Sequence, residues 1–167
     1  LSDNIWYLWS EAVDNASYDS LDLLEDSTAE EILDTVGDGM DQMVPKLGEV
    51  FRYMRDNHLY DIQAGEDSVE RTDGSYTVGL PSYRDAFIFI NRDNTFRDYQ
   101  SLIHEFGHFC SYYYNTVPEM YQGFHVDVCE LQSQGLEMLS TRYAGSLFGE
   151  GDSAYTYETM SDMLYVA

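Results

Sequence analysis

Positive charge is scarce in this sequence. It has a single lysine, Lys46, and only 8 Lys and Arg residues against 31 Asp and Glu, so its 167 residues carry a formal net charge of −23. A surface this acidic repels phosphate backbones and anionic lipid surfaces, so we expect no nucleic-acid partner. The same charge would attract cationic peptides. Strong acidity with so little lysine also favours the cell envelope or the exterior over the cytoplasm.

Long apolar runs and cysteines are also scarce. No run approaches the roughly 20 apolar residues of a bilayer-spanning helix, so we expect no membrane span, and no basic segment followed by an apolar stretch indicates a signal peptide. Cys110 and Cys129 are too few for a disulfide framework, and they do not form a Cys-x-x-Cys ligand pair. Small core residues are the simplest interpretation, and zinc ligands or a disulfide are the alternatives.

The chain has enough apolar material for one core. Hydrophobic residues make up 44% of it, and 167 residues suit a single domain. We therefore expect residues 1–167 to form one domain. Because the chain begins at Leu1 without a methionine, we also expect it to be part of a longer protein.

Helical periodicity dominates the pattern. Apolar residues recur on one side of the segment 27–57, which opens with the capping-box signal STAEEI, with Ser27 or Thr28 as the cap. Pro45 interrupts this segment and predicts two helices or a kink. Further helices are expected near the N-terminus around Trp6, Trp9 and Val13, and at about 98–114 and 127–144.

The pattern changes to that of strands between residues 68 and 91. The runs SVERT and SYTVG flank Asp73-Gly74, which is a two-residue hairpin signal, and AFIFIN at 86–91 is a compact β-type run. We therefore expect a mainly α fold with a small antiparallel β-sheet.

One segment inside the expected helix 98–114 carries the chemistry, His104-Glu105-Phe106-Gly107-His108. Residues four apart lie one above the other on a helix, so His104 and His108 can direct nitrogen atoms at one ion. Neutral imidazole suits zinc, and a catalytic zinc takes three protein ligands and a water. Glu105 is rotated by about 100° from His104, so it can act as general base on a metal-activated water without binding the metal. The spacing predicts one Zn²⁺ per chain.

Local spacing does not fix the third ligand. The metzincin pattern requires Gly and His where this chain has Ser111 and Tyr114, so that pattern fails. A glutamate from the following helix is the other common solution. Glu130 fits best, because the chain can turn and return within the 22 residues that follow His108. Glu137 lies about 10.5 Å further along the same helix, and could hydrogen-bond a ligand histidine or be a solvated glutamate. The other acidic candidates are Glu119 and Asp127, and the remaining histidines, His58 and His125, are interpreted as surface or loop residues.

Two segments around this site resemble a known family. GSYTVGLPSYRDAFIFINRDNTFRDYQSLIHEFGHF and DVCELQSQGLEML are similar to sequences of the oligoendopeptidase F and thimet oligopeptidase family of zinc metallopeptidases, and the resemblance covers roughly residues 30–148. It implies a zincin-like α+β fold in which the helix after the active-site helix carries the third ligand. By this resemblance His104, His108 and Glu130 bind the metal, and Glu105 is the general base. Glu137 matches a position around the helix that carries the third ligand.

The resemblance also implies where a peptide binds. An edge strand of the family pairs with the bound peptide, which corresponds here to the segment 86–91, with Phe87, Ile88 and Phe89 as substrate-binding residues. Such pairing uses the main chain, so it tolerates varied side chains. Family members usually cleave short peptides, because a second helical lobe narrows access to the cleft.

The chain departs from the family at three places. Many members have a histidine three residues after the core motif, where this chain has Ser111, although that histidine is not a metal ligand. The downstream segment rich in Gly, His and Tyr that steadies the oxyanion has no counterpart, and neither has the upstream lobe. We therefore expect the zinc-bearing central part of a longer enzyme. An oxyanion donor is worth about 2.7–4 kcal/mol in the transition state, so the isolated chain would turn over slowly.

Three functions are compatible with these features. The first is a zinc-dependent metalloendopeptidase that hydrolyses oligopeptides, with the missing parts of the same longer protein as a partner. The second is a non-catalytic zinc- or peptide-binding module. The third is a purely structural helical domain whose histidines pack or titrate.

Overall fold

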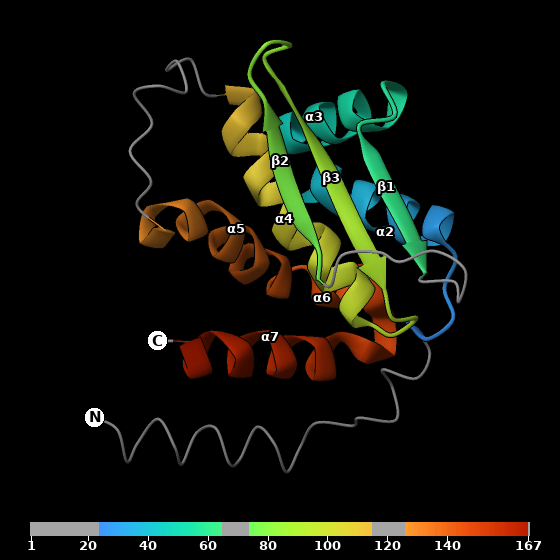
Figure 1. Cartoon of the computed structure of the whole chain (residues 1–167). Helices are drawn as coiled ribbons and strands as arrows, with labels where there is room; N and C mark the ends of the chain where they lie inside the picture. Colours follow the sequence, from blue (N-terminus) through green and yellow to red (C-terminus); the bar gives the residue numbers. More distant parts are fainter. Residues whose placement is uncertain (1–23, 65–73, 115–125, 167) are drawn as a thin grey trace.

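The computed structural model describes residues 24–64, 74–114 and 126–166 (Figure 1). The helices are α2 (Ala29–Met43), α3 (Pro45–Asp56), α4 (Arg97–Tyr114), α5 (Val126–Thr141), α6 (Ala144–Phe148), the 3₁₀ turn η4 (Gly149–Gly151) and α7 (Asp152–Val166). The strands are β1 (Tyr60–Ala64), β2 (Tyr76–Leu80) and β3 (Asp85–Arg92). Within the described ranges, no helix combines the length and the apolarity that crossing a membrane requires. The helix expected around residues 6–13 lies outside these ranges.

Helices α2 and α3 begin at the signals in the sequence. The Thr28 hydroxyl accepts a hydrogen bond from the Glu31 N–H at 3.2 Å, and the Glu31 carboxylate accepts one from the Thr28 N–H at 2.7 Å. This reciprocal pair satisfies two N–H groups that the helix itself cannot. Val44 has an extended backbone, with φ −149°, and Pro45 then opens α3. The predicted break at Pro45 is confirmed, and Thr28 rather than Ser27 is the cap.

The three strands form a mixed sheet in the order β1-β3-β2. Strand β3 pairs antiparallel with β2 and parallel with β1, so that Ile88 lies opposite both Thr77 and Tyr60. A short turn at 81–84 joins β2 directly to β3, which leaves the other edge of β3 for β1. The mainly helical class with a small sheet is therefore confirmed, while the sheet is mixed rather than wholly antiparallel. The first strand expected for the Asp73-Gly74 hairpin lies outside the described residues.

The central place of β3 corrects one expectation. Segment 86–91 belongs to the central strand and is not an edge strand: β1 pairs with it from Ile88 onward and β2 pairs with it up to Phe89, so both of these residues have partners on both sides. Ile88 is fully buried, whereas Phe87 and Phe89 lie on the opposite face and are half-buried. The ring of Phe89 stacks on Tyr76 of β2, with centroids 4.8 Å apart. Among the described residues, β2 and β1 are the edge strands.

Helices α2, α3 and α4 cover one face of the sheet (Figure 1). Ile88 and Ile90 of β3 are buried in the same core as the apolar side of α4. Phe106 of α4 meets Phe51 of α3 edge-to-face, with ring centroids 4.9 Å apart, a pairing worth about 0.5–1.5 kcal/mol beyond the buried area. This packing fixes the rotation of α4 about its axis, and α5 packs against α4 as well.

Candidate metal centre

Strand β3 and helix α4 are joined by a buried ion pair. Asp98, in the first turn of α4, is 3% exposed and accepts hydrogen bonds from the Asp93 N–H at 3.0 Å and from Arg92 Nε at 3.2 Å. Arg92 also donates to the carbonyl of Ser27 and to the side chain of Asn94. These bonds hold the start of α4 against the end of β3, nearly two turns before His104.

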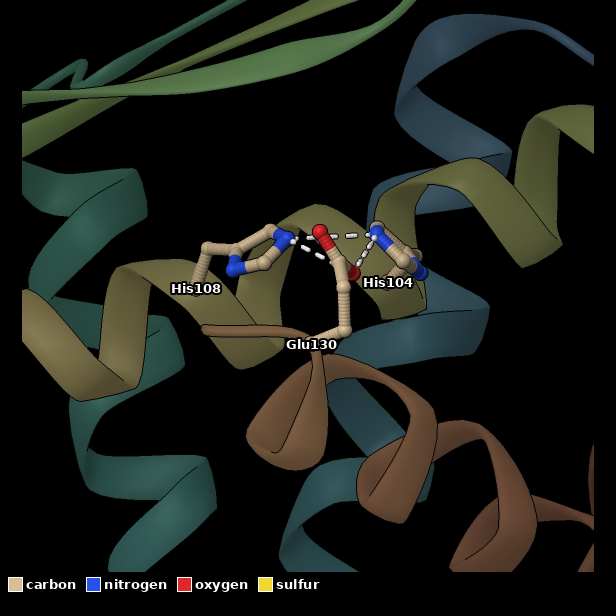
Figure 2. Close-up of side chains that lie close together, drawn as sticks. All are labelled: His104, His108 and Glu130. Carbon is tan, nitrogen blue, oxygen red and sulfur yellow. Dashed lines mark hydrogen bonds and ion pairs between the residues drawn. The ribbon is translucent and has the colours of Figure 1, made fainter. Parts of the chain in front are cut away.

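Three side chains from two helices converge on one point (Figure 2). His104 and His108 of α4 have their Nε2 atoms 3.2 Å apart. Glu130 of α5 places Oε2 at 3.3 Å from His104 Nε2 and at 3.5 Å from His108 Nε2. An ion with tetrahedral bonds of about 2.0–2.1 Å separates its ligand atoms by about 3.3–3.4 Å. The three donor atoms therefore fit one tetrahedral metal ion, with a fourth position left over.

The close approach of α5 to α4 depends on Gly107. A Cβ atom at this position would lie 2.6 Å from Ser133 Cα and 3.0 Å from the Gln132 carbonyl oxygen, which are backbone atoms that cannot simply turn away. A glycine in a helix costs about 1 kcal/mol relative to alanine. Here the absence of a side chain lets the backbones of α4 and α5 come into contact. The hydroxyl of the fully buried Ser133 then donates to Glu130 Oε2 at 2.8 Å and orients that carboxylate.

Glu137 holds the outer nitrogen of His104. Its Oε1 atom lies 2.5 Å from His104 Nδ1, and the residue is only 6% exposed, so the interpretation of Glu137 as a solvated glutamate is wrong. A proton on Nδ1, shared with this carboxylate, leaves Nε2 free to bind a metal. Burial alone lowers the pKa of His104, but the hydrogen bond and charge of Glu137, with two further carboxylates nearby, more than offset this and raise it. The pKa of His108 is lowered by burial and by the charge of His104.

Glu105 is buried next to His104 in the chain, and among the described residues it is not part of the group that could hold a metal ion. Its Oε2 atom accepts a hydrogen bond from the hydroxyl of Thr77 on β2 at 2.8 Å. Burial raises the pKa of Glu105, while the Thr77 bond and the charge of His104 act in the opposite direction. A carboxyl group with a raised pKa is suited to accepting and returning a proton.

A cavity of about 400 Å³ opens onto this arrangement. His104, Glu105 and Glu137 form part of its wall, and Asn91 and Gly74 contribute from the side of the sheet. Polar side chains such as Ser75, Asn91 and Gln100 stand in its wall, and they could hydrogen-bond a peptide backbone.

Other candidates from the sequence lie elsewhere. His58 packs near Tyr60, with ring centroids 6.5 Å apart, and has no place in the metal-binding group. Cys110 is a free thiol whose pKa burial raises to about 12, as expected of a core residue. Glu119 and His125 lie outside the described residues, as do the side chains of Asp127 and Cys129. No local sequence pattern indicated the role of Thr77, because its partner Glu105 lies 28 positions further along the chain, on a helix that packs against β2.

Comparisons with known proteins find peptidases of similar structure. No protein-family model matches the chain, and no curated protein does. Solved structures do match: an oligoendopeptidase F (TM-score 0.73, 29% identity) and PZ peptidase A with an inhibitor (TM-score 0.71, 29% identity), each over 84% of this chain. An oligoendopeptidase F from Bacillus anthracis matches 80% of the chain (TM-score 0.67, 26% identity). The chain spans only 24–25% of the length of these proteins. The likeness supports a relationship to oligoendopeptidase F-like peptidases over about a quarter of their length.

Proposed function

We propose that this chain is the zinc-binding catalytic segment of a metalloendopeptidase that hydrolyses oligopeptides. The observation that carries the proposal is the spacing of 3.2–3.5 Å among the ring nitrogens of His104 and His108 and one Glu130 oxygen, with Glu105 buried beside them. Two imidazoles and one carboxylate are a ligand set of catalytic zinc sites. The peptidase neighbours support the same reading.

In this proposal the ligands and the base have separate tasks. His104, His108 and Glu130 would hold the ion. Zinc, when bound, would polarise the scissile carbonyl and lower the pKa of a water molecule. Glu105 takes one proton from the attacking water as the C–O bond forms at the carbonyl carbon. The same carboxyl group then delivers that proton to the departing nitrogen as the C–N bond breaks, so the first products are a carboxylic acid and an amine. The second proton of the water then passes from the acid to the amine, which leaves a carboxylate and an ammonium group.

The edge of β2 is the described strand edge best placed for a peptide. One side of β2 pairs with β3, and its Thr77 touches the proposed base. A peptide pairing along this edge through main-chain hydrogen bonds would run next to Glu105, whatever its side chains. This assignment replaces the segment 86–91, which belongs to the central strand.

A non-catalytic zinc- or peptide-binding module is the second candidate. The group of His104, His108 and Glu130 is by itself sufficient for metal binding without turnover. The two functions share the metal centre and differ in turnover.

Glu105→Gln separates these possibilities. We expect about one zinc per purified chain in the parent and in the variant, measured by elemental mass spectrometry, because the ligands are unchanged. Cleavage of an internally quenched peptide should fall by at least about 100-fold in the variant, since the base is lost. Equal cleavage by both proteins would contradict the mechanism. If both proteins bound zinc and neither cleaved the peptide, the result would favour the binding module. If the parent bound no zinc, the result would contradict both the peptidase and the zinc-binding module.

A further inference from the structure

Strand β2 is attached to the active-site helix at two points. The Thr77 side chain faces α4, whereas its neighbours Tyr76 and Val78 lie on the other face and are each 39% exposed. Two residues further on, a Cβ atom on Gly79 would come within 2.6 Å of the Tyr112 ring, so the glycine lets that ring of α4 pack against the strand. The strand therefore lies along α4 with little room to shift.

The Thr77 hydroxyl lies within hydrogen-bond distance of two acceptors on one residue. Its Oγ1 atom is 2.8 Å from Glu105 Oε2 and 2.9 Å from the Glu105 carbonyl oxygen. Glu105 is 6% exposed, and within the described ranges the Thr77 hydroxyl donates a hydrogen bond to its carboxylate. A hydrogen bond to an ionised carboxylate is roughly twice as strong as one between neutral groups.

We propose that Thr77 is a positioning residue for Glu105, holding its carboxylate in the orientation that faces the cavity beside His104. The inference rests on the proposed peptidase function, in which Glu105 moves the proton. A terminal carboxylate torsion is broad and roughly two-fold, so helix geometry alone does not fix it. The hydroxyl of Thr77 removes this freedom. Because Thr77 belongs to the strand that would pair with a peptide, the same strand would align both substrate and base.

Three variants test this role. Thr77→Val keeps the shape of the side chain and removes its donor, and Thr77→Ser keeps the donor. Thr141→Val is the matched control, because the hydroxyl of Thr141 donates to the Met138 carbonyl of its own helix, at 2.8 Å, and contacts no part of the candidate site among the described residues. We expect kcat to fall about 10–100-fold in Thr77→Val, with KM and zinc affinity within about two-fold of the parent. Thr77→Ser should recover most of kcat, and Thr141→Val should match the parent.

A crystal structure of Thr77→Val gives a readout that needs no turnover. We expect the Glu105 carboxylate to rotate away from its parental position while His104, His108 and Glu130 stay in place. An unchanged carboxylate, or an unchanged kcat in an active preparation, would overturn the inference while leaving the proposed function intact. Loss of zinc from the parent protein would instead contradict the proposed function, and the carboxylate position would still decide the role of Thr77.

Discussion

Gly107 shows how the absence of one side chain shapes the candidate metal centre. It sits mid-helix in α4, where the backbone of α5 at Ser133 comes closest. A helix interior normally disfavours glycine, so its presence is explained by this contact rather than by propensity. The contact brings Glu130, three residues before Ser133, within reach of both histidines.

Gly107→Ala should therefore weaken the site. The added methyl would meet backbone atoms 2.6–3.0 Å away, so α5 must shift outward and carry Glu130 with it. We expect a loss of about 1–3 kcal/mol in the free energy of unfolding, measured in urea, and weaker zinc binding in a chelator competition.

Gly135→Ala is the matched control. Gly135 also lies mid-helix, in α5, but a Cβ atom there meets nothing within 4 Å. This variant should be stabilised by up to about 1 kcal/mol through helix propensity and should bind zinc like the parent. Equal behaviour of the two variants would contradict the close-approach explanation.

At the scale of elements, the site depends on where α4 begins. The pair of Arg92 at the end of β3 and Asp98 in the first turn of α4 sets this point, and both side chains are largely buried. The helix then runs under the sheet with its apolar side fixed by the core, which leaves the histidines facing α5.

Asp98→Ala should destabilise the protein strongly. Removing one partner of a buried ion pair typically costs about 3–5 kcal/mol, because the other charge stays buried. Asp152→Ala is the control, because Asp152 also lies in the first turn of a helix, α7, but is exposed. There we expect a loss of about 0.3–1 kcal/mol. Similar urea midpoints for the two variants would show that the Arg92–Asp98 pair does not anchor α4.

At the scale of the whole molecule, negative charge dominates. With 31 acidic and 8 basic residues, most carboxylates have no cationic partner available, even though Arg52, Arg55, Arg92 and Arg97 each pair with an acidic side chain. Such a net charge destabilises a folded chain through self-repulsion.

Salt should therefore stabilise this protein. Raising NaCl from about 0.02 to about 0.3 M shortens the Debye length from roughly 20 Å to below 8 Å and screens this repulsion. We expect Tm to rise in differential scanning calorimetry, because the exposed ion pairs lost to screening contribute little. An uncharged osmolyte at matched osmolarity serves as control. A Tm that fell with salt would mean that the ion pairs outweigh the repulsion.

The sequence alone determined those features of this protein that depend on residues a few positions apart. A capping box at Ser27 or Thr28 and the histidines one turn apart follow from the period of a helix, which fixes neighbours three or four residues away. The break at Pro45 follows from the missing N–H of proline. The mainly helical class also follows from periodicity, because apolar stripes at helical spacing are long and clear here.

Tertiary structure decided the rest. Strand order was not readable from AFIFIN, because a compact apolar run is consistent with an edge or a central strand, and only pairing made β3 central. The choice of Glu130 was an inference from spacing, and the packing of α5 on Gly107 is what brings it to the histidines. The contacts of Glu137 with His104 and of Thr77 with Glu105 join residues 33 and 28 positions apart. Contacts at such separations depend on how whole elements pack, which no local periodicity encodes.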